Sequence, residues 1–177
     1  MQDWLSRIRV PAGFVMAVVY FYFSRPTWPA LAFGCALAVP GLLRRAWATG
    51  HLRKNDQLAV TGPYGLTRNP LYFGSFLLGG GFSIAGRNLW ILVAFLAGFA
   101  AVYGNSIRQE AKHLRRLFPG DYPLYEQRVP LFWPRVWNAD LGNSRFSIER
   151  YWRNREYEAL LGFLGAVIVL VLKIRFA

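Results

Sequence analysis

The chain has 177 residues, of which 54% are hydrophobic and 17% aromatic, and its formal net charge is +12. This length suits one domain, and a soluble domain of this size usually carries more charge on its surface. The single cysteine, Cys35, excludes an intramolecular disulfide, and two histidines without cysteines nearby argue against a metal site.

Five apolar runs dominate the sequence and predict an all-α, polytopic integral membrane protein with about five transmembrane helices. They are Leu5–Phe23, Trp28–Leu43, Leu71–Ala85, Leu89–Gly104 and Tyr157–Leu172. Several are shorter than the ~20 residues that cross a bilayer, so the buried helices of a soluble protein are an alternative.

The distribution of charge favours the membrane. If all five runs cross it, 17 of the 21 Lys and Arg residues lie on the side of the N-terminus. Cytoplasmic loops carry such an excess, so the N-terminus and the polar segments 44–69 and 105–155 are predicted to be cytoplasmic, in a bacterial or archaeal cell membrane. The basic residues flank apolar runs and alternate with Trp and Tyr, which indicates anionic lipid headgroups rather than nucleic acid as partners.

We expect a single membrane-embedded domain, 1–177, in three parts. Residues 1–43 form a helical hairpin whose interior carries no ionisable group, so it is assigned as scaffold. Residues 44–137 contain the candidate site, between the second and third helices and after the fourth. Residues 138–177 form a polar segment and the last helix.

Residues 57–74, QLAVTGPYGLTRNPLYFG, are rich in residues that set backbone geometry. The sequence Thr61-Gly62-Pro63 predicts a turn, and Asn69-Pro70 predicts an N-cap followed by the first residue of a helix. The start of that helix, beside Arg68, would suit an anionic or polar small molecule. The alternative is a polar loop that only leads into a membrane helix.

The next two runs are joined by the short turn 86–88, so their helices are expected to pack antiparallel. Glycines recur along the first of them, at Gly74, Gly79, Gly80 and Gly81. Small residues let membrane helices approach closely, and we prefer this role to the alternative of making room for a lipid tail.

Residues 105–118 have the pattern of an amphipathic helix that lies on the cytoplasmic leaflet or packs on the bundle. Glu110 falls on the edge of its apolar face, where a carboxylate needs a cation or a polar ligand, and Arg68 is the expected partner. The alternative is a Glu110 that reaches water. Residues 119–137 contain four prolines and cannot form one helix; their aromatic residues suggest an interfacial belt or a lid.

Two blocks of this sequence resemble a known family of membrane enzymes. TGPYGLTRNPLYFG is similar to the motif G-x-Y-x-x-x-R-H-P-x-Y-x-G, and EAKHLRRLFPGDYPLYEQRVP is similar to E-E-x-x-L-x-x-x-F-G-x-x-Y-x-x-Y-x-x-x-V-P. These motifs belong to the isoprenylcysteine carboxyl methyltransferases and the phospholipid methyltransferases. The resemblance covers about residues 44–137.

The resemblance implies S-adenosylmethionine as the cofactor, in a cytosol-facing site between the two blocks. By position, its contacts would be His51, Gln57, Leu58, Ala59, Val60, Tyr64, Asn69, Pro70, Leu71, Tyr72 and Glu110. The catalytic candidates are Arg68, Arg108 and Glu110, with Arg68 or Arg108 meeting the polar end of the acceptor. From the residues alone, we expect His51 to be a solvated side chain beside the lipid headgroups.

The chain departs from the family pattern where Asn69 replaces a His, Ala111 replaces the second Glu, and Ser106 replaces an Arg. Asn69 cannot act as a base and Glu110 is assigned to the cofactor, which favours an acceptor that is anionic or already neutral. The resemblance therefore implies methyl transfer to a lipophilic acceptor from the bilayer, such as an isoprenylcysteine-like carboxylate, a phospholipid headgroup or another small membrane molecule. Alternatives are an NADPH-dependent, sterol-reductase-like enzyme and a non-catalytic lipid-binding protein.

Overall fold

The computed structural model of the protein describes residues 15–52, 57–135, 142 and 146–176, and every regular element among them is a helix. Residues 15–23 are helical. The other helices are α2 (Trp28–His51), α3 (Pro63–Leu66), α4 (Pro70–Ala85), α5 (Leu89–Leu117), α6 (Asp121–Arg128), α7 (Ile148–Arg153) and α8 (Tyr157–Phe176).

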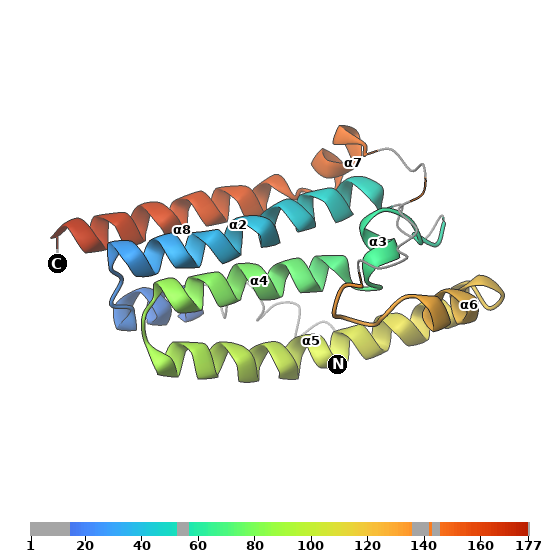
Figure 1. The fold of residues 1–177 in the computed structure, drawn as a ribbon, viewed down its shortest axis with the longest axis horizontal. Helices are drawn as coiled ribbons and strands as arrows, with labels where there is room; N and C mark the ends of the chain where they lie inside the picture. The colour runs from blue at the N-terminus through green and yellow to red at the C-terminus, as the bar shows by residue number, and fades with distance from the viewer. Residues whose placement is uncertain (1–14, 53–56, 136–141, 143–145, 177) are drawn as a thin grey trace.

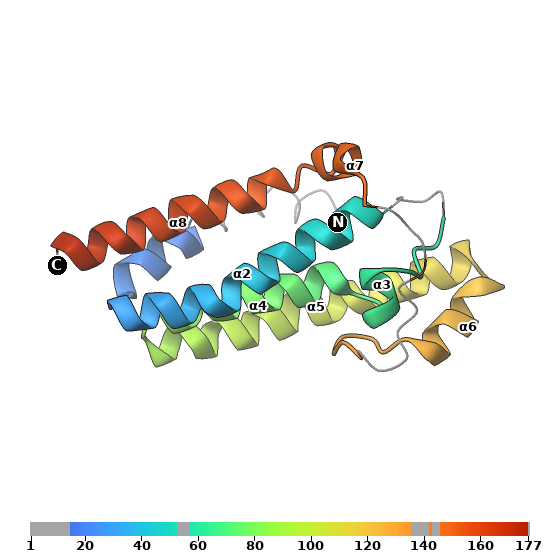
Figure 2. The same ribbon diagram turned by 45° about the horizontal axis from the view of Figure 1, so that its top comes forward.

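The long helices α2, α4, α5 and α8 run along the longest axis of the molecule (Figures 1 and 2). The short helices α3, α6 and α7 gather at one end, which we call the polar end. The turns 24–27 and 86–88 lie at the opposite end (Figure 1). Segments from both halves of the chain therefore meet at the polar end, as expected from the sequence.

Prolines and polar caps set several helix ends. Pro70 begins α4, because its fixed φ suits the first helical position. The side chain of Asn88 accepts a hydrogen bond of 2.9 Å from the Trp90 amide and so caps the start of α5. Ser147 caps α7 in the same way, through the amide of Arg150 at 3.3 Å.

Two helices are longer than the sequence patterns suggested. The polar stretch predicted to begin after Leu43 continues α2 to His51, and residues 105–117 continue α5 instead of forming a separate helix on the leaflet. No proline interrupts either stretch, and the first one after α5 is Pro119. α5 is therefore about 43 Å long at 1.5 Å per residue.

Glycines bring the backbones of α2 and α4 into direct contact. A Cβ atom at Gly34 would lie 2.5 Å from the carbonyl oxygen of Gly81, and one at Gly41 would lie 2.6 Å from that of Gly74. The contacts are reciprocal and follow the antiparallel course of the two helices. Close packing is thus confirmed as the role of Gly74 and Gly81.

Leu170 of α8 joins a buried cluster near the end opposite the polar end. It packs with Leu31 of α2 and Ala85 of α4, and Cys35 lies against this cluster. Three residues further on, the ammonium group of Lys173 donates to the carbonyl oxygens of Phe21 and Tyr22, the second at 3.3 Å. These carbonyls end the helix of residues 15–23, so Lys173 caps that helix and holds α8 beside it.

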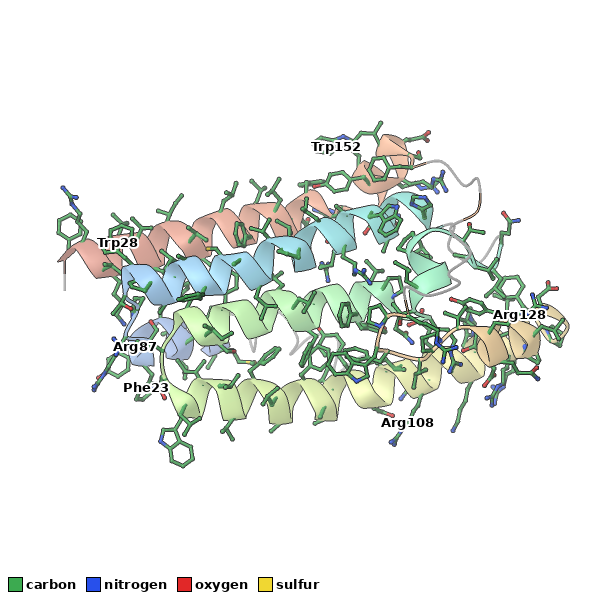
Figure 3. All side chains as sticks on the ribbon, in the orientation of Figure 1. Phe23, Trp28, Arg87, Arg108, Arg128 and Trp152 are labelled. Atoms are coloured by element: carbon green, nitrogen blue, oxygen red, sulfur yellow. The ribbon has the colours of Figure 1, made fainter. Side chains whose placement is uncertain are left out.

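Two of the described helices, α5 and α8, are long and apolar enough to span a membrane. Only 6% of the apolar window of each is buried, so these windows are not the core of a soluble protein. Exposed Phe23 and Trp28 lie at one end of the bundle, and exposed Trp152 lies on α7 toward the other (Figure 3). Five membrane crossings stay a prediction.

Candidate functional site

The segments that carry the two sequence motifs are hydrogen-bonded to each other at the polar end. The bonds run from Arg68 N to Pro130 O (2.9 Å), Thr67 Oγ1 to Phe132 O (3.0 Å), Asn69 Nδ2 to Leu131 O (2.9 Å), Arg135 N to Leu66 O (2.9 Å) and Tyr125 Oη to Tyr64 O (2.8 Å). Residues about 60 positions apart in the sequence therefore form one unit.

Tyr125→Phe tests this junction. Its hydroxyl is buried and donates to the Tyr64 carbonyl, so its loss leaves that carbonyl without a partner. We expect the free energy of unfolding in mixed detergent micelles to fall by about 1–2 kcal/mol. Tyr122→Phe is the matched control, because the Tyr122 hydroxyl accepts only a long, 3.4 Å bond from Arg68. Equal effects of the two variants would contradict the assignment.

The start of α4 is covered, contrary to the expectation of an open anion site. Thr67, Asn69 and Pro70 are buried. Asn69 occupies the N-cap position, but its side chain makes no capping bond; its Nδ2 donates to the Leu131 carbonyl oxygen. The ring of Phe132 packs on Phe73 with centroids 5.6 Å apart, so residues 129–133 close over the first turn of α4.

Arg68 does not pair with Glu110, the partner expected from the sequence. Its Nη1 lies 3.6 Å from the carboxylate of Glu126 and donates to the Tyr122 hydroxyl. Glu126 also accepts two bonds of 2.7 Å from Arg115, and these hold the pKa of its carboxyl below the ordinary value. Arg68 thus serves to join the two motif segments.

Glu110 lies on the exposed side of α5 and forms no ion pair within the described part of the chain. Its carboxylate is nevertheless in electrostatic reach of Tyr64 on α3. Burial raises the pKa of the Tyr64 phenol far above its ordinary value, and the charge of Glu110 raises it further, followed by Tyr125, Tyr72 and Glu156. Tyr64 is therefore influenced by charged and phenolic groups from several different segments.

A cavity of about 330 Å³, which we call the polar chamber, opens beside Tyr72. It is lined by Arg45, Thr49, Leu52, Leu71, Tyr72, Ser75, Tyr103, Asn154 and Glu156. The rings of Tyr72 and Tyr103 form one wall, with centroids 5.2 Å apart. Its volume is within the range of small-molecule sites. Two of the predicted cofactor contacts, Leu71 and Tyr72, therefore face a real cavity.

Arg45 and Glu156 form an ion pair in the wall of the polar chamber. The guanidinium donates from Nε to Oε1 at 2.7 Å and from Nη2 to Oε2 at 3.0 Å. Its Nη1 donates to the hydroxyl of Ser75 at 2.5 Å. The two side chains are 24% and 6% exposed, and such two-point contact fixes both in position.

The segment before α8 places Glu156 by binding the end of α2. The amide of Ser147 donates to Gly50 O (3.1 Å), Arg150 Nη1 to His51 O (3.3 Å) and Asn154 Nδ2 to Thr49 O (3.3 Å). The last carbonyls of a helix have no partner within it, so these donors complete α2. They also fix the chain two residues before Glu156.

Three other predicted cofactor contacts line a second cavity. Gln57, Leu58 and Val60 border a space of about 610 Å³ whose opposite wall includes Tyr125 and Arg128. Ala59, between them in sequence, does not border it. The predicted contacts are thus divided between two separate cavities.

His51 and Arg108 differ from their expected settings. His51 is buried rather than solvated: its Nδ1 lies 2.9 Å from the Trp47 carbonyl oxygen, and its ring lies 3.0 Å from where a Cβ on Gly62 would be. Arg108 is exposed and projects from α5 away from the other helices (Figure 3). It is not brought to the polar chamber.

Sequence patterns missed the residues that give the polar chamber its charge. Arg45 was grouped with basic residues near the headgroups, and Glu156 with a polar connection. The available signals were an acidic residue directly before the last apolar run and Ser75 within the third run. Neither signal shows which distant residue contacts the side chain concerned.

Comparison with known proteins gives a family and two relatives. The phospholipid methyltransferase family matches residues 31–121. The chain is 32% identical to the cobalt-zinc-cadmium resistance protein CzcN of Cupriavidus metallidurans, over 91% of this chain and 77% of that protein. It is also 32% identical to the nickel-cobalt-cadmium resistance protein NccN of Alcaligenes xylosoxydans xylosoxydans, over 96% of this chain and 84% of that protein. No solved structure matches the chain.

Proposed function

Because the chain belongs to the phospholipid methyltransferase family, we propose that it transfers a methyl group from S-adenosylmethionine to a lipophilic molecule in the membrane. The observation that carries this proposal is the joining of the two motif segments beside the polar chamber. The family and the exposed apolar helices α5 and α8 indicate a membrane protein.

Residues of the chamber, of the second cavity and of the joined motif segments fit the chemistry of this cofactor. Its sulfonium is a cation, and the faces of Tyr72 and Tyr103 suit a cation. Its amino group needs a hydrogen-bond acceptor, which Glu110 can supply because its carboxylate has no competing ion pair among the described residues. Gln57, Leu58 and Val60 would contact the remaining part of the cofactor.

When bound, S-adenosylmethionine supplies an electrophilic methyl group. The task left to the protein is to align the acceptor with that group and to exclude water. Residues 129–133 close one side of the site, and the buried Tyr64 holds the turn between α3 and α4 through its carbonyl bond to Tyr125. The fixed Arg45–Glu156 pair supplies a rigid polar wall.

A binding titration tests the proposed function. Calorimetry with the purified full-length protein in detergent is expected to show binding of S-adenosylmethionine and of its demethylated product. Binding of NADPH instead would favour a reductase, and binding of neither would favour a non-catalytic lipid-binding protein. Incubation with methyl-labelled cofactor and a lipid extract, followed by mass spectrometry, then identifies the acceptor.

The variant Glu110→Gln should weaken cofactor binding about tenfold or more, because a charged hydrogen-bond partner is lost. Gln109→Ala is the matched control, since Gln109 is the exposed neighbour on the same helix. Unfolding of both variants should be unchanged, because Glu110 makes no ion pair with the described residues. If Glu110→Gln binds the cofactor as the wild type does, Glu110 is not a contact.

A further inference from the structure

An apolar groove of about 650 Å³ adjoins the polar chamber. Its walls come from α4, α5 and α8, with Met16 at one edge, and its aromatic residues are Phe82, Phe95, Phe99, Tyr103 and Phe163. Arg45, Ser75 and Tyr103 line both the groove and the chamber. The two spaces are therefore direct neighbours, with these three side chains between them.

The groove has the shape that an extended hydrocarbon chain requires. On α5 it runs from Ala94 to Tyr103, which is about 14 Å at 1.5 Å per residue. Gly98 on α5 and Gly162 on α8 face it, and a Cβ atom at either would meet nothing within 4 Å. Because α5 and α8 are the exposed apolar helices, the groove lies among the segments that face lipid tails.

The charges in the chamber define the polar group that it can accept. Arg45 and Glu156 neutralise each other, so the chamber offers no net charge to an ionic ligand. A guanidinium carries five N–H donors, and the bonds to Glu156 and Ser75 use three of them. Oε1 of Glu156 accepts one bond and has room for another. The wall thus presents both donors and an acceptor without excess charge.

We propose that the chamber and groove together bind the methyl acceptor, and that this acceptor is a single-chain amphiphile with an uncharged head that both donates and accepts hydrogen bonds, such as a hydroxyl or an amide. Its chain lies in the groove along α5, and its head meets Arg45 and Glu156 beside Tyr72, where the head O–H or N–H points at Glu156 Oε1. As the bond from the head atom to the methyl carbon forms and the carbon–sulfur bond of the cofactor breaks, the proton of the head passes to the Glu156 carboxylate. An anionic head would add an uncompensated charge to this balanced wall, which is costly away from water. This assignment rests on the proposed methyltransferase function.

Photolabelling of the full-length protein in lipid nanodiscs tests the proposal. The probe is a twelve-carbon alcohol that carries a diazirine on its chain. We expect labelled peptides from residues 94–103 and 159–163, and we expect dodecanol to compete about tenfold better than dodecanoate. Equal competition by dodecanoate would overturn the neutral head, and labelling spread over all lipid-facing helices would overturn the groove.

Gly98→Leu provides the sharper test, because Gly98 lines the groove and its new Cβ would meet no atom within 4 Å, so the added side chain occupies groove space. Labelling should fall about tenfold or more. Gly104→Leu is the matched control, since Gly104 is on the same helix, has equal free space and lies outside the groove. Its labelling should equal that of the wild type, and equal labelling of both variants would overturn the proposal.

Calorimetry with S-adenosylmethionine separates this inference from the proposed function. Gly98→Leu should still bind the cofactor. If the wild type labels as expected but binds no cofactor, the amphiphile site stands and the methyltransferase function fails. If the cofactor binds and the labelling pattern is wrong, the function stands and the acceptor site fails.

Discussion

Replacing Gly81 with alanine is expected to lower the free energy of unfolding by about 2–4 kcal/mol, measured by unfolding in mixed detergent micelles. The added Cβ would lie against the carbonyl oxygen of Gly34 and 2.8 Å from the backbone nitrogen of Ala38. Neither atom can move without shifting α2. Because α2 carries Arg45, the variant should also reduce methyl transfer.

Gly80→Ala is the matched control for this prediction. A Cβ at Gly80 would find its nearest neighbours at 3.7 Å and 3.8 Å, which is ordinary contact. Since alanine favours a helix over glycine by about 0.8–1.0 kcal/mol, this variant should be as stable as the wild type or more so. Equal loss of stability in the two variants would show that the α2–α4 contact is looser than described here.

Glu156→Gln is expected to cost about 2–3 kcal/mol of stability and to abolish methyl transfer. It leaves the charge of Arg45 without its carboxylate, and breaking a buried pair costs about 3–5 kcal/mol. The partial exposure of Arg45, 24%, places the expected value below that range. Glu158→Gln is the control, because Glu158 pairs with Arg155 on an exposed surface and such pairs contribute about 0–1 kcal/mol.

The double variant Arg45→Met, Glu156→Leu separates stability from function. Replacing a buried ion pair with apolar side chains is often neutral for stability, so unfolding should return to near the wild-type value. Methyl transfer should stay lost, because the polar wall of the chamber is gone. If transfer recovered together with stability, the pair would serve folding alone.

Sequence patterns predicted the helices well where local chemistry sets their ends. Pro70 and the turn 86–88 mark real boundaries, and Gly74 and Gly81 of the third run do mediate close packing. The meeting of the two motif segments followed from counting helices between them. The helix ends depend on residues that are neighbours in sequence. The meeting of the two segments depends on the alternating direction of successive helices in the bundle.

The contacts that define the polar chamber could not be predicted in this way. Arg45 and Glu156 are 111 residues apart, and the docking of α7 and α8 on α2 brings them together. Arg68 pairs with Glu126 rather than Glu110 because α5 continues straight to Leu117, which turns Glu110 toward solvent. Partner choice of this kind depends on helix length and rotation, and a linear pattern specifies neither.

The hydrogen bonds from Ser147, Arg150 and Asn154 to the end of α2 bear on how the protein matures. A nascent chain inserts its early helices first, and it holds both motif segments before residue 147 leaves the ribosome. Until then the final turn of α2 lacks its donors and the chamber lacks its carboxylate. Catalytic competence would therefore arise late in biosynthesis, which would keep a half-made polypeptide from consuming cofactor.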